Sequence, residues 1–139
     1  MDAFDSDVLI YAGGGHPLGH RVRALFLGDA SGEAGGTAGV GSVLLLPEVL
    51  SKPLRDGSED EIERLTALLG RIDLRPTDNA TAVLATSLSA SYGLRAADAV
   101  HLATAIGAGA DRFITNNRSD FPKTIAEIDV TYPEDLADA

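Results

Sequence analysis

Apolar runs alternate along the chain with segments in which apolar residues recur at helical spacing, and this alternation predicts strands and helices in turn. The first apolar run covers residues 8–11, is entered from Phe4, and is typical of a buried strand. It ends at the glycine triplet 13–15, which breaks regular structure. Further strands are predicted over residues 37–43, 72–74, 112–115 and 128–131.

The helical segments lie between these strands. The sequence places Pro53 at the end of one helix and Gly93 at the end of another, since both residues commonly mark helix ends. Ser58 and Glu61 form a capping-box pattern, and Thr77 or Asp78 is expected to cap the helix that Gly93 ends. The predicted helices cover residues 17–27, 42–50, 59–69, 78–91 and 95–108, with a glycine-rich loop over 29–36.

Strands that alternate with helices predict an α/β fold in which helices cover both faces of a parallel sheet. With 139 residues the chain is long enough for one core, and we expect one domain over residues 1–139. We find no internal repeat and no domain linker. In such folds chemistry gathers at the carboxyl ends of the strands.

Composition narrows the function classes. The chain has no cysteine, which excludes disulfides, thiolate metal sites and cysteine nucleophiles. A net charge of −10 argues against nucleic-acid binding through a broad basic face, but it fits carboxylates gathered around a metal. No apolar stretch reaches the ~18 residues of a membrane span and no signal peptide is visible, so a cytoplasmic protein without membrane contact is expected.

Four positions carry candidate chemistry, and each also has a simpler explanation. On the predicted first strand, Asp5 and Asp7 would point to the same face, where carboxylates are costly unless paired or metal-bound; alternatively, Asp5 precedes the strand and is solvated. Glu48 lies in an apolar run, either as a ligand or as the solvated residue of an amphipathic helix. Asp98 either faces a site or only complements a helix dipole. The polar residues 115–120 follow a strand and could form a plain surface turn.

Together these segments resemble the PIN-domain family, in its order and at its spacing over nearly the whole chain. The resemblance is carried by the start Asp-Ser-Asp-Val-Leu-Ile at residues 5–10, by Ser42 followed six residues on by Glu48, and by Leu-Arg-Ala-Ala-Asp-Ala-Val-His-Leu-Ala-Thr-Ala at 94–105. Thr115, with Asp120 and Phe121 after it, completes the set.

The resemblance implies a single PIN-like domain with a central parallel sheet of four or five strands and an acidic pocket at its carboxyl edge. By analogy Asp5, Glu48 and Asp98 are the catalytic trio that holds Mg²⁺ or Mn²⁺, and Asp120 is a supporting ligand. The family usually has a fourth carboxylate two residues after the threonine, where this chain has Asn117, so a second metal is in doubt. The supporting side chains implied around the metal are Ser6, Asp7, Thr115 and Asn117.

The function implied by the resemblance is that of a metal-dependent endoribonuclease, a VapC-like toxin with an RNA substrate. Such proteins usually form homodimers and are neutralised by a cognate antitoxin protein. A bound metal would let an acidic pocket accept a phosphate. RNA contacts would then come from a local basic rim, for which the candidates are Arg21, Arg23, Lys52, Arg55 and Arg95.

Two alternative functions stay open at this point. Asn117 is the feature that would fit a PIN-fold binding module that has lost catalysis. The start Asp5-Ser6-Asp7 also resembles haloacid-dehalogenase-type phosphatases, but Lys52 and Lys123 are the only lysines and neither has the required setting. The histidines at positions 16, 20 and 101 are expected to be solvated or packed rather than catalytic, and the glycine triplet is expected to be only a turn.

Overall fold

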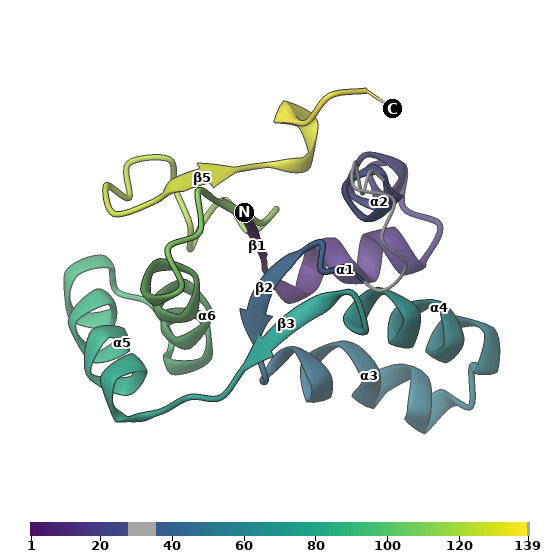
Figure 1. Ribbon diagram of the computed structural model, residues 1–139, viewed down its shortest axis with the longest axis horizontal. Helices are drawn as coiled ribbons and strands as arrows, with labels where there is room; N and C mark the ends of the chain where they lie inside the picture. Colours follow the sequence, from purple (N-terminus) through teal and green to yellow (C-terminus); the bar gives the residue numbers. More distant parts are fainter. Residues whose placement is uncertain (28–35, 139) are drawn as a thin grey trace.

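A five-stranded parallel sheet in the order β3-β2-β1-β4-β5 runs through the centre of the computed structural model (Figure 1). The structure describes residues 1–27 and 36–138. The strands are β1 (Asp2–Phe4), β2 (Gly39–Ser42), β3 (Ile72–Arg75), β4 (Arg112–Ile114) and β5 (Asp129–Thr131). The predicted α/β class with a central parallel sheet is therefore confirmed.

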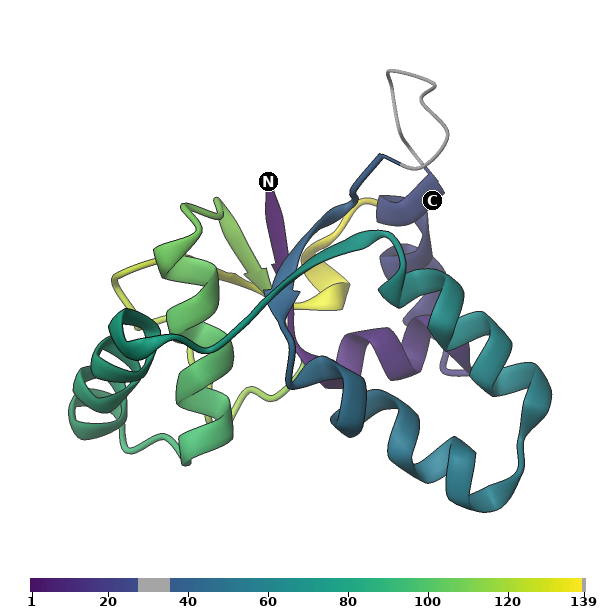
Figure 2. The ribbon, with the colours of Figure 1, turned by 60° about the horizontal axis from the view of Figure 1, so that its bottom comes forward.

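Helices cover both faces of this sheet, and α3 and α4 lie side by side (Figure 2). None of the helices in the described ranges is long and apolar enough to cross a membrane. The helices are α1 (Ser6–Gly13), α2 (Gly19–Leu27), α3 (Leu45–Asp56), α4 (Glu59–Leu69), α5 (Asn79–Tyr92) and α6 (Ala96–Gly107), followed near the C-terminus by the 3₁₀ helix η1 (Pro133–Asp135).

Alternate residues of the central strands point into two separate cores. Ala3 and Phe113 pack with the helices α5 and α6, whereas Phe4 and Ile114 pack with the helices α1 to α4. This alternation is the period of two that a strand imposes on its side chains. The two cores hold the helices in place at the carboxyl edge of the sheet, where α1, α3 and α6 begin.

Several predicted element ends are confirmed. Asp78 caps α5 by accepting a hydrogen bond from the Thr81 N–H at 2.9 Å. Gly93 ends the same helix in the left-handed conformation, with φ of 68°, which glycine adopts without steric cost. The predicted glycine-rich loop lies outside the described residues except for Gly36.

The prediction of a strand over residues 8–11 is wrong, because these residues belong to the helix α1, and the strand β1 is the shorter segment before it. The buried residues of α1 are Val8, Leu9, Ala12 and Gly13, a spacing of one helical face. Asp5 caps this helix: its side chain accepts the Ser6 N–H. The apolar run was too short to distinguish a strand from a buried helix.

Two details of the predicted helix ends also differ. Pro53 lies inside α3, where it is buried, and the helix ends instead at Gly57, whose φ is 68°. Ser58 is the N-cap residue of α4, but its side chain makes no capping hydrogen bond.

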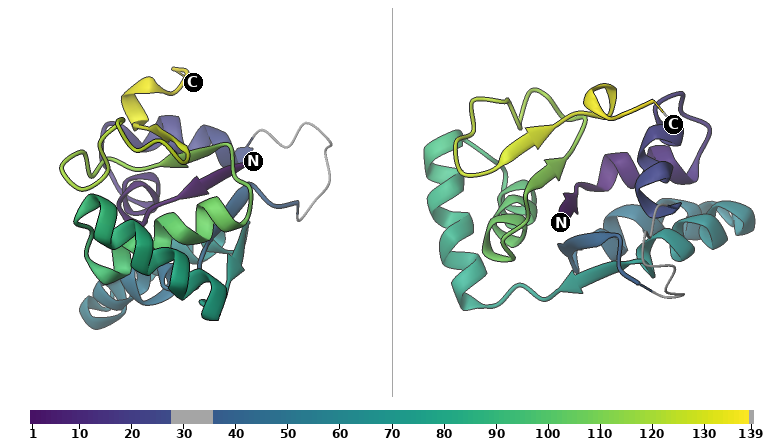
Figure 3. Two further views of the ribbon diagram at one scale, coloured as in Figure 1. Left: turned by 90° about the vertical axis from the view of Figure 1, so that its left-hand side faces the viewer. Right: turned by 45° about the horizontal axis from the view of Figure 1, so that its top comes forward.

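The acidic C-terminal segment is not a free tail. Strand β5 leads into η1, which lies beside α2 (Figure 3). The Arg21 guanidinium donates to the carbonyl oxygens of Glu134 and Leu136 at 2.9 and 3.2 Å. Arg21 thus ties the last segment of the chain to the second helix.

Candidate functional site

The candidate residues gather where the three central strands end. Asp5 directly follows β1, Thr115 directly follows β4, and Glu48 lies in the first turn of the helix that follows β2. Asp98 lies in the first turn of α6. Parallel strands bring their carboxyl ends to one edge, and for this reason residues distant in the sequence meet there.

Asp5 is the most buried carboxylate of this group, with 4% of its surface exposed. One oxygen accepts the Ser6 N–H at 2.8 Å, and the other accepts the Thr115 hydroxyl at 2.8 Å. Burial nevertheless raises the pKa of Asp5 above its ordinary value, because the two hydrogen bonds do not replace full hydration. The carboxylate is therefore fixed in orientation, and the charge of His101 only partly offsets the cost of its burial.

Glu48 is paired with a histidine from α6. The Nε2 atom of His101 lies 2.7 Å from Oε1 of Glu48, and the His101 side chain is 1% exposed. The hydrogen bond with His101 lowers the pKa of Glu48, and a hydrogen bond with Ser6 acts in the same direction. Burial opposes protonation of His101, but the bond to Glu48 and the charge of Asp5 outweigh it, so that the pKa of His101 is raised. Glu48 is thus held ionised.

Asp98 and Asp120 form a second pair at the same edge. Burial raises the pKa of Asp98 to about 6, and the charge of Asp5 together with a hydrogen bond with Asp120 adds to the effect. The side-chain N–H of Asn117 donates to Asp120 at 2.9 Å. Asn117 therefore orients Asp120, and Asp120 brings a further carboxylate to Asp98.

Asp7 lies on the first turn of α1 and accepts the Asn116 N–H at 3.1 Å. Its other oxygen, Oδ1, is buried and has no hydrogen-bond partner among the described residues. Burial, with the nearby charge of Asp5, raises the pKa of Asp7 to about 7. A buried carboxylate oxygen without a donor is a position where a cation or its hydration water would be stabilised.

The donor set fits a divalent metal. Ligand atoms of Asp5, Glu48 and His101 all lie within 4.8 Å of one another, and Asp98 interacts electrostatically with both Asp5 and His101. Carboxylate oxygens are the ligands that Mg²⁺ and Mn²⁺ prefer. Burial is the main cause of the raised pKa values of Asp5 and Asp98, and repulsion from neighbouring carboxylates adds to it; a bound cation would offset both effects.

Some of the sequence reasoning about this site was wrong. Asp5 and Asp7 do not lie on one face of a strand, because Asp5 is the N-cap residue of α1 and Asp7 lies within that helix. His101 was expected only to pack; it is buried, but its ring also pairs with Glu48. Its position three residues after Asp98, on the same helical face, indicated that it lies near the site but not that it contacts Glu48.

The proposed basic rim is mostly occupied by structural contacts. Arg21 binds carbonyl oxygens near the C-terminus, Arg23 donates to the Ala12 carbonyl at 2.9 Å, and Lys52 pairs with Asp56 at 2.9 Å. Arg95 is the N-cap residue of α6, three residues before Asp98, and is exposed. Among these candidates Arg95 lies nearest in sequence to a site carboxylate.

This chain is similar to known proteins both in its sequence and in its fold. The PIN domain family matches residues 3–126. No match was found among curated proteins. A structure described as a toxin–antitoxin complex from Klebsiella pneumoniae superimposes with a TM-score of 0.71 at 22% identity, covering 96% of this chain and 98% of the other.

A second similar structure is VapBC2 from Rickettsia felis bound to a DNA fragment from their promoter. It superimposes with a TM-score of 0.71 at 18% identity, covering 94% of this chain and 97% of the other. At these identities the two structures establish a shared fold over nearly the full length of both chains.

Proposed function

The chain belongs to the PIN domain family, and from this premise we propose that it is a metal-dependent endoribonuclease that acts as the toxin of a toxin–antitoxin pair. The observation that carries the proposal is the meeting of Asp5 and Glu48, whose ligand atoms lie within 4.8 Å of each other and of His101, with Asp98 near enough for its charge to interact with that of Asp5. The family match also favours this function over that of a dehalogenase-type phosphatase.

In this proposal Asp5, Glu48 and Asp98 hold Mg²⁺ or Mn²⁺, with Asp120 in support. The bound ion would supply positive charge toward a phosphodiester and would acidify a water molecule. The chain's own residues prepare the site: Thr115 and the Ser6 N–H fix the oxygens of Asp5.

His101 has a preparatory role for Glu48. Its bond at 2.7 Å favours the ionised carboxylate, so that Glu48 can bind a cation without first releasing a proton. Asp98, whose pKa is about 6, is mostly ionised at neutral pH, and below pH 6 it would have to release a proton when a metal binds.

The alternative of a binding module without catalysis depended on Asn117. This side chain donates to Asp120, which in turn hydrogen-bonds with Asp98. A fourth carboxylate is therefore present beside the trio, although it comes from a different position of the turn. This arrangement supports retention of catalysis.

The proposal includes a protein partner. One of the similar structures is described as a toxin–antitoxin complex, and the other is described as VapBC2. We propose that a cognate antitoxin neutralises this chain by placing an arginine near Asp5 and Asp98, because a guanidinium can bind carboxylates in a bidentate way. A homodimer in the cytoplasm is part of the same proposal, and exposed apolar side chains such as Leu46 and Leu54 on α3 are available for subunit contact.

The decisive experiment is RNA cleavage by the purified chain with Mg²⁺, with Mn²⁺ and with a chelator. We expect activity only with a divalent ion. Asp5→Asn, Glu48→Gln and Asp98→Asn should each reduce the rate by ~10²-fold or more, since each removes a charged group that acts on the reaction. Asp60→Asn, in an exposed turn of α4, is the matched control. If the three site variants cleave as fast as this control, the proposed site is wrong.

A further inference from the structure

Two aromatic rings are stacked beside the acidic site. The rings of Tyr11 and His16 have centroids 3.8 Å apart and planes inclined by 14°. Tyr11 lies on α1 one turn after Asp7, and His16 lies in the turn between α1 and α2, after the glycine triplet. None of the steps argued for metal binding uses this pair.

The backbone around it holds the His16 ring in place. The Leu18 N–H donates to Nδ1 of His16 at 3.1 Å, and the His16 carbonyl accepts the Gly19 N–H at 2.9 Å. In the neutral ring the proton is consequently on Nε2, which has no hydrogen-bond partner within residues 1–27 and 36–138. The His16 residue is exposed to solvent, while its ring is stacked on that of Tyr11.

The first residue of α2, Gly19, lies close to the backbone of Tyr11. A side chain at Gly19 would bring a Cβ atom to 2.1 Å from the Tyr11 carbonyl oxygen. Only glycine permits this approach, and it keeps the turn that carries His16 close to Tyr11. The stacked pair is therefore built by the backbone and is not a chance contact of two surface side chains.

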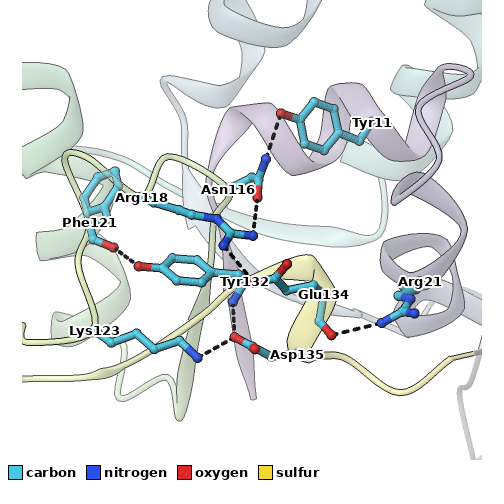
Figure 4. Close-up of polar contacts among 9 residues, drawn as sticks. All are labelled: Tyr11, Arg21, Asn116, Arg118, Phe121, Lys123, Tyr132, Glu134 and Asp135. Carbon is cyan, nitrogen blue, oxygen red and sulfur yellow. Dashed lines mark hydrogen bonds and ion pairs between the residues drawn. The ribbon is translucent and has the colours of Figure 1, made fainter.

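Tyr11 is connected to the acidic site through residue 116. The Asn116 side-chain N–H donates to the Tyr11 hydroxyl at 3.2 Å (Figure 4). The Asn116 backbone N–H donates to Asp7. The same Asn116 side chain accepts a hydrogen bond from Arg118 at 3.5 Å. The preceding residue, Thr115, donates to Asp5. A short run of backbone thus positions both the stacked rings and the buried carboxylate.

We propose that the Tyr11–His16 pair is a stacking subsite for a nucleobase of the RNA substrate, next to the scissile phosphate. The inference rests on the proposed nuclease function. A flat π-face of a preordered pair binds any base with little loss of side-chain entropy. Nε2–H of His16 can in addition donate to an acceptor on the base edge.

Stacking on a base does not depend on free positive charge at this position. Asp7 lies one helical turn before Tyr11, and the guanidinium groups of Arg23 and Arg64 are engaged by the carbonyl oxygens of Ala12 and Gly13. Stacking on an uncharged base needs no positive surface, and most of the basic candidates near the site are engaged in structural contacts. A nuclease with a net negative charge can thus gain affinity for RNA when its aromatic rings stack on a base.

The direct test uses the histidine ring signals in proton NMR spectra, which are few because the chain has three histidines. We would titrate the wild type with adenosine 5′-monophosphate and, separately, with ribose 5-phosphate. The subsite predicts an upfield ring-current shift of the His16 signals with the first ligand only. Equal shifts with both ligands, or no His16 shift with either, would overturn it.

The kinetic test compares His16→Ala with His20→Ala, which removes another exposed histidine of the same region. His16→Ala should raise KM for RNA cleavage about tenfold with kcat nearly unchanged, whereas His20→Ala should leave both unchanged. Tyr11→Phe, which keeps the ring and loses the bond to Asn116, should give a smaller rise in KM. If both histidine variants have the same KM as the wild type, the subsite is refuted while the nuclease proposal stands. A wild type that does not cleave RNA refutes the nuclease proposal instead, and the NMR titration still decides the subsite.

Discussion

At the scale of single residues, the site is a set of carboxylates that differ in protonation. Glu48 is held ionised by His101, whereas burial and the neighbouring charge of Asp5 raise the pKa of Asp98 to about 6 and that of Asp7 to about 7. Without a cation the edge is therefore partly protonated at neutral pH. This state is consistent with a site whose charge is completed by a bound ion.

Asp7→Asn should stabilise the metal-free chain at pH 8 by about 1–3 kcal/mol. The folded pKa of about 7 lies above the ordinary value of 3.8, so between these values the folded chain keeps a proton that the unfolded chain releases. Stability therefore falls as the pH rises through this window, and the full penalty is present above pH 7. Urea unfolding at pH 8 and pH 4 in the presence of a chelator measures the effect.

At pH 4 the Asp7→Asn substitution should change stability little, because Asp7 is then neutral in the folded chain. Asp60→Asn serves as the exposed control at both pH values. A destabilised Asp7→Asn variant at pH 8 would show that the charge of Asp7 contributes favourably to the metal-free fold.

Asn117→Asp should tighten Mn²⁺ binding about fivefold, because a new carboxylate would face Asp120 where an amide now donates to it at 2.9 Å. The same repulsion should lower the stability of the metal-free variant. Calorimetric titration with Mn²⁺ measures the affinity. Ser119→Asp, which adds an equal charge at an exposed position of the same turn, is the control, and an equal gain in both variants would mean that position 117 has no specific access to the metal.

At the scale of helices and strands, close backbone approach decides the geometry of the sheet centre. Gly39 of β2 pairs with Asp2 of β1, and a Cβ atom at position 39 would lie 2.2 Å from the Asp2 carbonyl oxygen and 2.8 Å from Cε2 of Phe4. These strands precede the helices that carry Asp5 and Glu48. The separation of β1 and β2 therefore bears on the separation of the two carboxylates.

Gly39→Ala should lower the free energy of unfolding by about 2 kcal/mol, because the backbone oxygen cannot move aside as a flexible side chain would. Gly107→Ala is the matched control: nothing lies within 4 Å of the added Cβ atom. That control should be neutral or slightly stabilising. Equal unfolding midpoints in urea for the two variants would show that β1 and β2 separate without cost.

The element scale also shows what the sequence could and could not predict. The helices around Asp78, Gly93 and Asp98 were predictable because caps and apolar spacing agree there. The first strand was not, since residues 8–11 satisfy a strand pattern locally, and their packing against α2, α3 and α4 is what favours a helix. Gly13 shows this packing: an added Cβ atom there would lie 2.5 Å from the Leu65 side chain.

The family resemblance predicted several residues that the structure brings to one edge of the sheet, but it did not predict how their side chains pair. No local pattern indicates that His101 contacts Glu48, 53 residues away in the sequence. Nor does any pattern indicate that the side chain of Asn117 donates to Asp120 rather than to another carboxylate of the site. Such contacts depend on how α3, α6 and the turn after β4 meet in space. Sequence spacing within one element cannot determine them.

At the scale of the whole molecule, the acidic site lies between the two cores. Asp5 and Glu48 belong to elements that pack into the core of α1 to α4, whereas Asp98 and His101 belong to α6, which packs into the other core. A cation bound by Asp5, Glu48 and Asp98 would therefore link both halves of the fold. Its binding energy would be lost on unfolding, since the unfolded chain has no such arrangement.

Addition of Mg²⁺ or Mn²⁺ at about a hundred times its dissociation constant should therefore stabilise the wild type by about 2.7 kcal/mol, or about 10 °C in Tm. The increase should be smaller at pH 5.5 than at pH 8, because Asp98 and Asp7, with pKa values of about 6 and 7, then hold protons that compete with the ion. Differential scanning calorimetry with and without the metal measures both effects.

Asp98→Asn should reduce the metal-induced increase in Tm, although the Tm of this variant without metal is expected to rise. Asp60→Asn should respond as the wild type does. An increase that is the same in all three proteins would mean that the metal binds outside the edge formed by Asp5, Glu48 and Asp98.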